Sequence, residues 1–234
     1  MGTVNNTQLI LQDLWRKYGS FELPAEWDGN VYGGGKLSQR YWELLTTVRY
    51  GEFGPDSVVL DLGGSGEGVD KEKWHGAGFL ARLLAPHVRQ VWVADPACSD
   101  GTYANVACIK ACAFEPTSKW IKAELAMRTV THVTCVSVLE HIPQPERLRM
   151  LTELHDFART HGVQTIVLTC EYHPTRIFWP HVLDAMHLSE CVSLFTDYYL
   201  DRYEASPTHC VNAMADGVLP MWYPISIRLH RAVT

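Results

Sequence analysis

The chain has 234 residues, of which 47% are hydrophobic, so it can form one large α/β domain or one domain with a small cap. The formal net charge is -6, which argues against nucleic acid as a bulk partner because phosphate binding needs a basic face. No apolar run approaches the roughly 20 residues that span a bilayer, and the N-terminus lacks the pattern of a signal peptide.

Cysteine and histidine usage gives two further expectations. The seven cysteines are an odd number, include no C-x-x-C pair and partly lie in apolar runs, which predicts a reduced, cytoplasmic protein. The eleven histidines include no H-x-x-x-H motif with an acid between, so we predict no metal site. We also expect no membrane association, and the oligomeric state stays open.

The first 50 residues predict two helices that flank a glycine-rich segment. Apolar residues recur at helical spacing over residues 7–18 and again over 37–50. Residues 21–36 contain Trp27, Tyr32 and three consecutive glycines, which suits either a connecting loop or a flap that closes over a ligand. We expect residues 1–50 to form a cap that belongs to the same domain as residues 51–234.

A short apolar run followed by glycines stands out at residues 57–68, Ser-Val-Val-Leu-Asp-Leu-Gly-Gly-Ser-Gly-Glu-Gly. Its composition predicts a strand over 58–62 that is buried on both faces of a parallel sheet. The glycines let a ligand come close to the backbone, and Asp61 lies just before them. Strand, acid and glycine loop together predict the opening of a nucleotide-type binding site in a doubly wound sheet.

Charge helps to choose the ligand of this loop. A dinucleotide would require G-x-G-x-x-G, and counting from Gly64 the last glycine position is taken by Val69. Asp61 and Glu67 would also lie near the two phosphate charges. A ligand with a positive centre and no phosphate, such as S-adenosylmethionine, fits better, which disfavours a nicotinamide oxidoreductase.

The middle of the chain predicts alternating helices and strands. We expect a helix over 79–84, a strand over 91–95, a strand over 106–115 and a helix over 117–127. Asp95 ends the second strand, where an acid can accept two hydrogen bonds from ribose hydroxyls. The alternative for Asp95 is a turn-forming residue before Pro96.

The last hundred residues predict two more strands of the sheet and its ending. A β-branched run over 133–138 is followed by Leu139-Glu140-His141, and an amphipathic helix covers 145–160. A strand over 165–170 precedes Glu171 and His173, and a helix follows over 181–188. The final strands are expected within 191–200 and 221–230.

Three stretches in this order resemble the class I S-adenosylmethionine-dependent methyltransferases. Asp61 and Gly63 match the family's acid-x-Gly-x-Gly-x-Gly motif, with Ser65 and Glu67 at the places of the second and third glycines. Asp95 and the sequence S-V-L-E-H-I-P at 137–143 match the later motifs, so the resemblance covers about residues 58–143. It implies an α/β fold, with a doubly wound, mostly parallel seven-stranded sheet, helices on both faces, N-terminal cap helices and an antiparallel final strand pair.

The resemblance also implies a set of site residues around S-adenosylmethionine. The loop would hold the amino-acid tail and ribose, Asp95 the ribose diol, Phe114 the adenine, and the end of the fourth strand the methyl group. The implied cofactor-binding residues are Asp61, Gly63, Gly64, Ser65, Gly66, Asp95, Pro96, Phe114, Ser137 and Leu139. The candidate bases are His173, His141 and Glu171, and His173 comes first because Glu171 next to it can orient or charge it.

The expected reaction is in-line transfer of the cofactor's methyl group to a small-molecule or sugar-like acceptor. No D/N/S-P-P-Y/F motif follows the fourth strand, which argues against methylation of DNA bases. The alternative is a methyltransferase-like domain without catalysis that binds a cofactor or serves as a protein-interaction subunit. Ser65 and Glu67 motivate this alternative, and the discriminating feature is whether Glu67 blocks the methionine end of the pocket.

Overall fold

The computed structural model describes residues 6–18, 39–65, 72–111, 130–172, 183–205, 210–211 and 221–232. The helices are α1 (Asn6–Tyr18), α2 (Gln39–Gly51), α3 (Phe79–Leu84), α5 (Gln144–His161) and α6 (Ala185–Ser193), with 3-10 turns η1 (Ala85–His87) and η2 (Leu139–His141). The strands are β1 (Val58–Leu62), β2 (Gln90–Asp95), β3 (Gly101–Tyr103), β4 (Val106–Lys110), β5 (His132–Val136), β6 (Thr165–Tyr172), β7 (Tyr198–Ala205), β8 (Cys210–Val211) and β9 (Met221–Arg231). In this part of the chain no helix is both long and apolar enough to cross a membrane.

The strands form one sheet in the order β3-β4-β2-β1-β5-β6-β9-β7, and β8 pairs with β9. The five adjacent strands β4, β2, β1, β5 and β6 are parallel, whereas β9 is antiparallel to both β6 and β7. The mixed α/β fold with an antiparallel ending is as predicted. The sheet exceeds the seven strands expected, because β3 forms a short antiparallel pair with β4 and β8 adds to β9.

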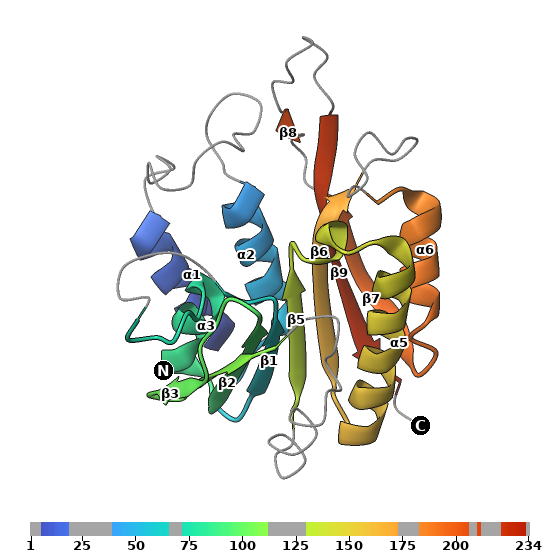
Figure 1. Cartoon of the computed structure of the whole chain (residues 1–234). Coiled ribbons are helices and arrows are strands. Elements are labelled where there is room, and N and C mark those ends of the chain that lie inside the picture. Colours follow the sequence, from blue (N-terminus) through green and yellow to red (C-terminus); the bar gives the residue numbers. More distant parts are fainter. Residues whose placement is uncertain are drawn as a thin grey trace.

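Helices lie on both faces of the sheet (Figure 1), with α1, α2 and α3 on one side and α5 and α6 on the other. The alternation of side chains along β1 serves both cores, because Leu60 and Leu62 pack with α5 and α6 while Val59 packs with α1, α2 and α3. All five residues of β1 are buried, as expected for a central strand. The connection from β4 to β5 lies outside the described residues, so double winding stays a prediction.

Most predicted elements match, but the strand predicted over 106–115 ends at Lys110, and the segment between β6 and β9 differs more. The helix predicted over 117–127 lies outside the described residues. The helix predicted over 181–188 begins later, because Asp184 caps α6 by accepting a hydrogen bond from the His187 amide at 2.9 Å. The strand predicted within 191–200 is wrong in its bounds, since β7 starts at Tyr198. Residues 191–193 still belong to α6, and Phe195 and Tyr198 pack in the core at the turn and at the start of β7.

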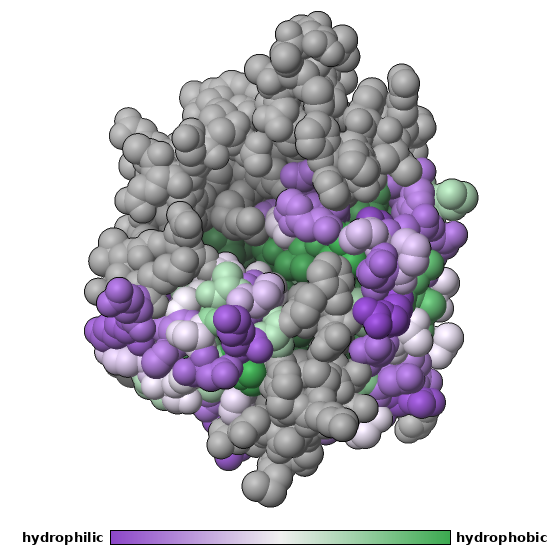
Figure 2. Space-filling view, viewed as in Figure 1, coloured by the Kyte–Doolittle hydropathy of each residue, from purple (hydrophilic) through white to green (hydrophobic). Residues whose placement is uncertain are grey.

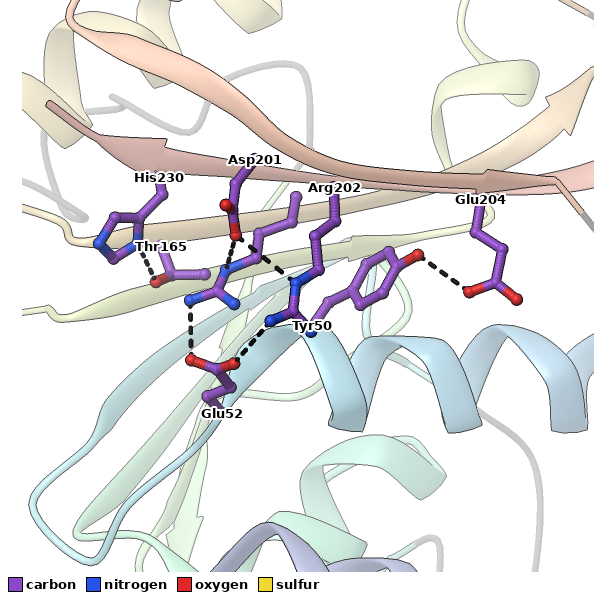
Figure 3. A network of polar contacts seen from close by, with 8 residues as sticks. Tyr50, Glu52, Thr165, Asp201, Arg202, Glu204 and His230 are labelled. Atoms are coloured by element: carbon purple, nitrogen blue, oxygen red, sulfur yellow. Dashed lines mark hydrogen bonds and ion pairs between the residues drawn. The ribbon is translucent and has the colours of Figure 1, made fainter.

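A polar network joins the C-terminal end of α2 to β7 and β9 (Figure 3). Glu52 accepts a hydrogen bond from Arg228 at 2.9 Å and lies 3.5 Å from Arg202. Asp201 lies 3.3 Å from Arg228, whose side chain is only 7% exposed, and Tyr50 donates to Glu204 at 3.0 Å. A buried guanidinium between two acids is strongly oriented. The network therefore fixes α2 on the face made by β5, β6 and β9.

Candidate cofactor site

The turn after β1 requires glycine at two successive positions for different reasons. Gly63 has φ +68, and a Cβ there would collide with the side chain of Val138. A Cβ on Gly64 would collide with the carboxylate of Asp61. The Gly64 carbonyl accepts a hydrogen bond from the Gly78 amide at 2.7 Å, at the start of α3. The predicted loop is thus built as a tight turn directly over the carboxyl end of β1.

Asp61 lies beneath this turn and is 1% exposed. One of its carboxylate oxygens accepts a hydrogen bond from the Thr134 hydroxyl on β5 at 2.7 Å. The other oxygen is the atom that leaves no room for a side chain at Gly64. Through these contacts Asp61 orders the loop and joins it to the neighbouring strand β5.

Asp95 connects the end of β2 to the glycine turn. Its carboxylate accepts the Ala97 amide at 2.7 Å and the Ser65 amide at 3.3 Å, and the residue is 8% exposed. Pro96 follows it and is exposed. Each carboxylate oxygen has two acceptor sites, so these two backbone bonds leave acceptor capacity for hydroxyl donors.

The carboxyl end of β5 contains a strained residue. Ser137 has φ +52, an unusual conformation for a residue with a side chain. Its amide donates to the Thr169 hydroxyl at 3.0 Å and the Thr169 carbonyl at 3.2 Å on β6. Its hydroxyl donates to a carboxylate oxygen of Glu43 at 2.6 Å. Contacts from two neighbouring elements therefore hold the strained conformation.

Glu43 belongs to α2 and is fully buried, and it is not among the site residues predicted from the sequence. Thr46 and Thr47 on the same helix are also fully buried, and the Thr46 hydroxyl lies 2.5 Å from that of Ser226 on β9. The usable signal was a face of the helix with one acid and two small hydroxyl residues at i, i+3 and i+4. A solvated helix face usually carries several long charged side chains, whereas this face carries a single acid beside two small hydroxyl residues, which indicates burial.

The structure brings together the predicted residues at the ends of β1, β2 and β5. Leu62 is in register with Ala94 and with Cys135, so the residues that follow these strands lie at one edge of the sheet. The residues gathered there are Asp61, Gly63, Gly64, Ser65, Asp95 and Ser137.

The remaining predicted site residues lie in η2 after β5, near the end of β6, or outside the described residues. Leu139 is fully buried in the core beside α5, and His141 is exposed in η2. Glu171 is half-buried near the end of β6, where its carbonyl accepts the Leu183 amide at 3.0 Å. Gly66, Phe114 and His173 lie outside the described residues, as do Trp27, Tyr32 and Glu67.

Buried thiols surround the edge and are poorly suited to nucleophilic chemistry. Cys135 on β5 and Cys170 on β6 are fully buried, and burial raises the pKa of both thiols. A hydrogen bond with Cys108 and burial likewise raise the pKa of Cys98, which follows β2. Since the thiolate is the nucleophile, these pKa shifts make Cys135, Cys170 and Cys98 poor nucleophiles, whereas the hydrogen bond with Cys98 lowers the pKa of Cys108 on β4.

Figure 2 shows hydrophobic residues lining a recess in the middle of the face shown, close to where β5 and β6 end in Figure 1. A separate cavity of about 430 Å³ lies between α6 and β7, with Tyr172, Leu188, Leu200 and Tyr203 among its lining residues. None of its lining residues belongs to the glycine turn or to the ends of β1, β2 and β5. In the described part of the chain, no group of three or more His, Cys, Asp or Glu side chains could hold a metal ion.

The acceptor groups at this edge of the sheet suit a cofactor that has hydroxyls and a positive charge. Asp61, Asp95 and Glu43 are all buried carboxylates at the ends of β1, β2 and β5. Three carboxylates would repel a pyrophosphate, whereas a ribose diol and a cation are complementary to them. The residues present therefore fit S-adenosylmethionine better than a dinucleotide.

Comparison with known proteins gives structural likeness without sequence likeness. No protein-family model matches the chain, and no curated protein matches it. The N-methyltransferase NodS of Bradyrhizobium japonicum aligns with a TM-score of 0.52 and 12% identity over 83% of this chain and 97% of that one. A SAM-dependent methyltransferase of Anabaena variabilis aligns with a TM-score of 0.51 and 13% identity over 98% of this chain and 96% of that one.

A larger enzyme shares the same arrangement in part of its length. The small RNA methyltransferase HEN1 aligns with a TM-score of 0.52 and 8% identity, covering 87% of this chain and 26% of HEN1. All three structures are methyltransferases, and one of them acts on small RNA. The chain therefore has the fold of the class I S-adenosylmethionine-dependent methyltransferases.

Proposed function

We propose that the chain is an S-adenosylmethionine-dependent methyltransferase that acts on a small-molecule or sugar-like acceptor. The observation that carries the proposal is the Asp95 carboxylate, which accepts the Ser65 amide and so joins the glycine turn to the end of β2. Ligands of open α/β sheets bind at the carboxyl ends of the strands, where the strand order reverses. In this sheet that reversal lies between β1 and β5.

The proposed cofactor binding follows from the contacts at this edge. The exposed side of Gly63, Gly64 and Ser65 would accept the amino-acid tail and ribose, and Asp95 would accept hydrogen bonds from the ribose hydroxyls. Pro96 and Phe114 are proposed beside the ribose and adenine, and Gly66 in the loop. S-adenosylmethionine would supply an electrophilic methyl group on a positively charged sulfur.

The protein's own contribution would be positioning and proton removal. Asp61, held by Thr134, would keep the turn rigid, and Ser137 would define the end of the site near the transferred methyl group. Glu171, His173 and His141 remain the proposed candidate bases for an acceptor hydroxyl. Of the two described candidates, Glu171 lies at the end of a central strand, which supports it over the exposed His141.

Support for a small acceptor comes mainly from charge. The formal net charge of -6 and the buried acids at the edge oppose an extended phosphate backbone. The similar structures include both an enzyme named as an N-methyltransferase and one named for small RNA. The alternative is a cofactor-binding or interaction domain without catalysis. Such a domain could still bind S-adenosylmethionine, but it would not transfer the methyl group.

The test is calorimetric titration of the wild type, Asp95→Asn and Asp100→Asn with S-adenosylmethionine, and with NADH as the control ligand. Loss of a charge-assisted hydrogen bond predicts that Asp95→Asn weakens cofactor binding about tenfold or more. Asp100→Asn is the matched control, because Asp100 is an exposed acid five residues away that accepts the Lys110 amide at 2.7 Å. The proposal is contradicted if the wild-type protein does not bind S-adenosylmethionine, or if it binds NADH instead.

A further inference from the structure

A carboxylate from the N-terminal part of the chain lies at the end of β5. Glu43 sits on α2, which packs on the sheet face formed by β5, β6 and β9, and it is fully buried. Its carboxylate accepts the Ser137 hydroxyl at 2.6 Å. The acid therefore comes from the helix that covers the sheet, whereas Asp61 and Asp95 come from β1 and β2.

Several contacts fix the position of this carboxylate. The strained Ser137 is held by two hydrogen bonds to Thr169, and its side chain in turn orients Glu43. One turn further along α2, Thr46 is bonded to Ser226 on β9. Strained residues held by their surroundings cluster at ligand sites, and this one lies next to the reversal of strand order.

The three acids at the edge differ in what they touch. Asp61 packs beneath Gly64 and accepts the Thr134 hydroxyl, while Asp95 accepts two backbone amides of the surrounding turns. Both thereby build the loop that would hold the cofactor's tail and ribose. Glu43 alone among these three lies over the end of β5, where the proposed function has the reacting sulfur.

A sulfonium has no N–H or O–H to donate, so a protein recognises its charge mainly through nearby anions. An anion in a water-poor site interacts with a cation far more strongly than one in water. We propose that the Glu43 carboxylate, oriented by Ser137, is the counter-charge of the cofactor's sulfonium. This inference rests on the proposed function and adds to it the residue that distinguishes the charged cofactor from its neutral product.

The chemistry of transfer gives this counter-charge a purpose. When an acceptor hydroxyl forms its bond to the methyl group, its proton passes to the proposed base, the sulfur–carbon bond breaks, and the electron pair of that bond returns to sulfur. The sulfur thereby becomes neutral, and its attraction to the Glu43 carboxylate is lost. The carboxylate therefore favours the methyl donor over S-adenosylhomocysteine and helps the product to leave.

The test compares the affinities for S-adenosylmethionine and S-adenosylhomocysteine by calorimetry. Glu43→Gln keeps an oxygen that accepts the Ser137 hydroxyl and removes only the charge. We expect it to weaken S-adenosylmethionine about tenfold and S-adenosylhomocysteine less than about twofold. Asp56→Asn is the matched control, because it removes the charge of an exposed acid in the turn before β1, at the opposite edge of the sheet, and it should leave the ratio of the two affinities unchanged.

Ser137→Ala provides a second test if Glu43→Gln does not fold well enough to titrate. It leaves the carboxylate charged but poorly oriented, so the preference for the charged ligand should fall about threefold. An equal loss for both ligands, or an unchanged ratio in both variants, overturns the assignment of Glu43. Wild type that binds neither ligand overturns the proposed function as well, which separates the two failures.

Discussion

Gly63 and Gly64 are adjacent, yet different physical constraints require glycine at each. Gly63 needs a positive φ, whereas Gly64 needs the space that the Asp61 carboxylate fills. The first constraint belongs to the turn, and the second depends on a side chain three residues earlier. Together they explain how a turn with Ser65 at a position where the family has glycine can still lie close over β1.

Gly64→Ala should therefore disturb both stability and the proposed cofactor site. The added methyl group would push against Asp61, and overpacking of this kind costs about 1–3 kcal/mol. Gly54→Ala is the control, because a Cβ at Gly54 meets no atom within 4 Å. Urea unfolding of both variants measures the difference, and equal stabilities would contradict the packing argument.

At the scale of elements, the end of α2 and the start of β5 share a buried titratable group. His132 is 8% exposed, and its ring lies 5.2 Å from that of Phe53 and bonds the Thr131 hydroxyl at 2.7 Å. Burial, together with the neighbouring Arg228 charge, lowers the pKa of His132 to about 4. The junction between these elements is therefore built around a neutral histidine.

This lowered pKa predicts a loss of stability in mild acid. Between about pH 6.5 and pH 4 the unfolded state binds more protons at His132 than the native state, so stability falls as the pH falls. The expected loss from pH 7 to pH 5 is about 2 kcal/mol. His132→Gln should flatten this part of the curve measured by urea unfolding, and an equally steep curve would show that His132 is not responsible.

Glu52 lies at the same junction, but it affects stability in a different pH range from His132. The hydrogen bond from Arg228 lowers the pKa of Glu52 below its ordinary value of 4.5. Its contribution is present above that value and is lost only as the pH falls through the lowered pKa. The loss due to Glu52 therefore lies mainly below the window assigned to His132.

Elements with a strong internal pattern were predictable, and elements that depend on a partner were not. Short-range patterns of buried residues mark β1, β2, α3 and α5, and α5 ends next to Gly162, which has φ +70. β7 is largely exposed at Tyr199–Tyr203, so its sequence lacks the burial alternation that reveals a strand. Its position follows from pairing with β9, which no local pattern contains.

At the scale of the whole molecule, some residues of the candidate site were predictable from local sequence patterns, and others depend on packing between distant segments. Asp61, Gly63 and Asp95 follow apolar strands, so their place at the carboxyl edge could be inferred from the sequence. Glu43 could not, because it reaches Ser137, which lies 94 residues later in the chain, only when α2 docks on β5, β6 and β9. The sequence around Glu43 indicates a buried polar helix face, but it does not show which residues that face contacts.

The order of the strands predicts that the last strand is needed for the whole fold. β9 lies between β6 and β7, so removing it leaves both strands without their shared partner. It also carries Ser226 and Arg228, which bond Thr46 and Glu52 at the other end of the sequence. A chain that ends before residue 221 should therefore lose the cooperative unfolding of the sheet and of α2 together.

The measurement is urea unfolding followed by circular dichroism and tryptophan fluorescence. The control ends after residue 232, which keeps β9 and the bond from the Ala232 amide to the Asp197 carbonyl at 3.0 Å. The control should show one coincident transition by both probes, and the shorter chain none. If the shorter chain still unfolds cooperatively, α2 and the parallel strands form a stable unit alone. The long-range bonds of β9 would then orient the site rather than hold the fold.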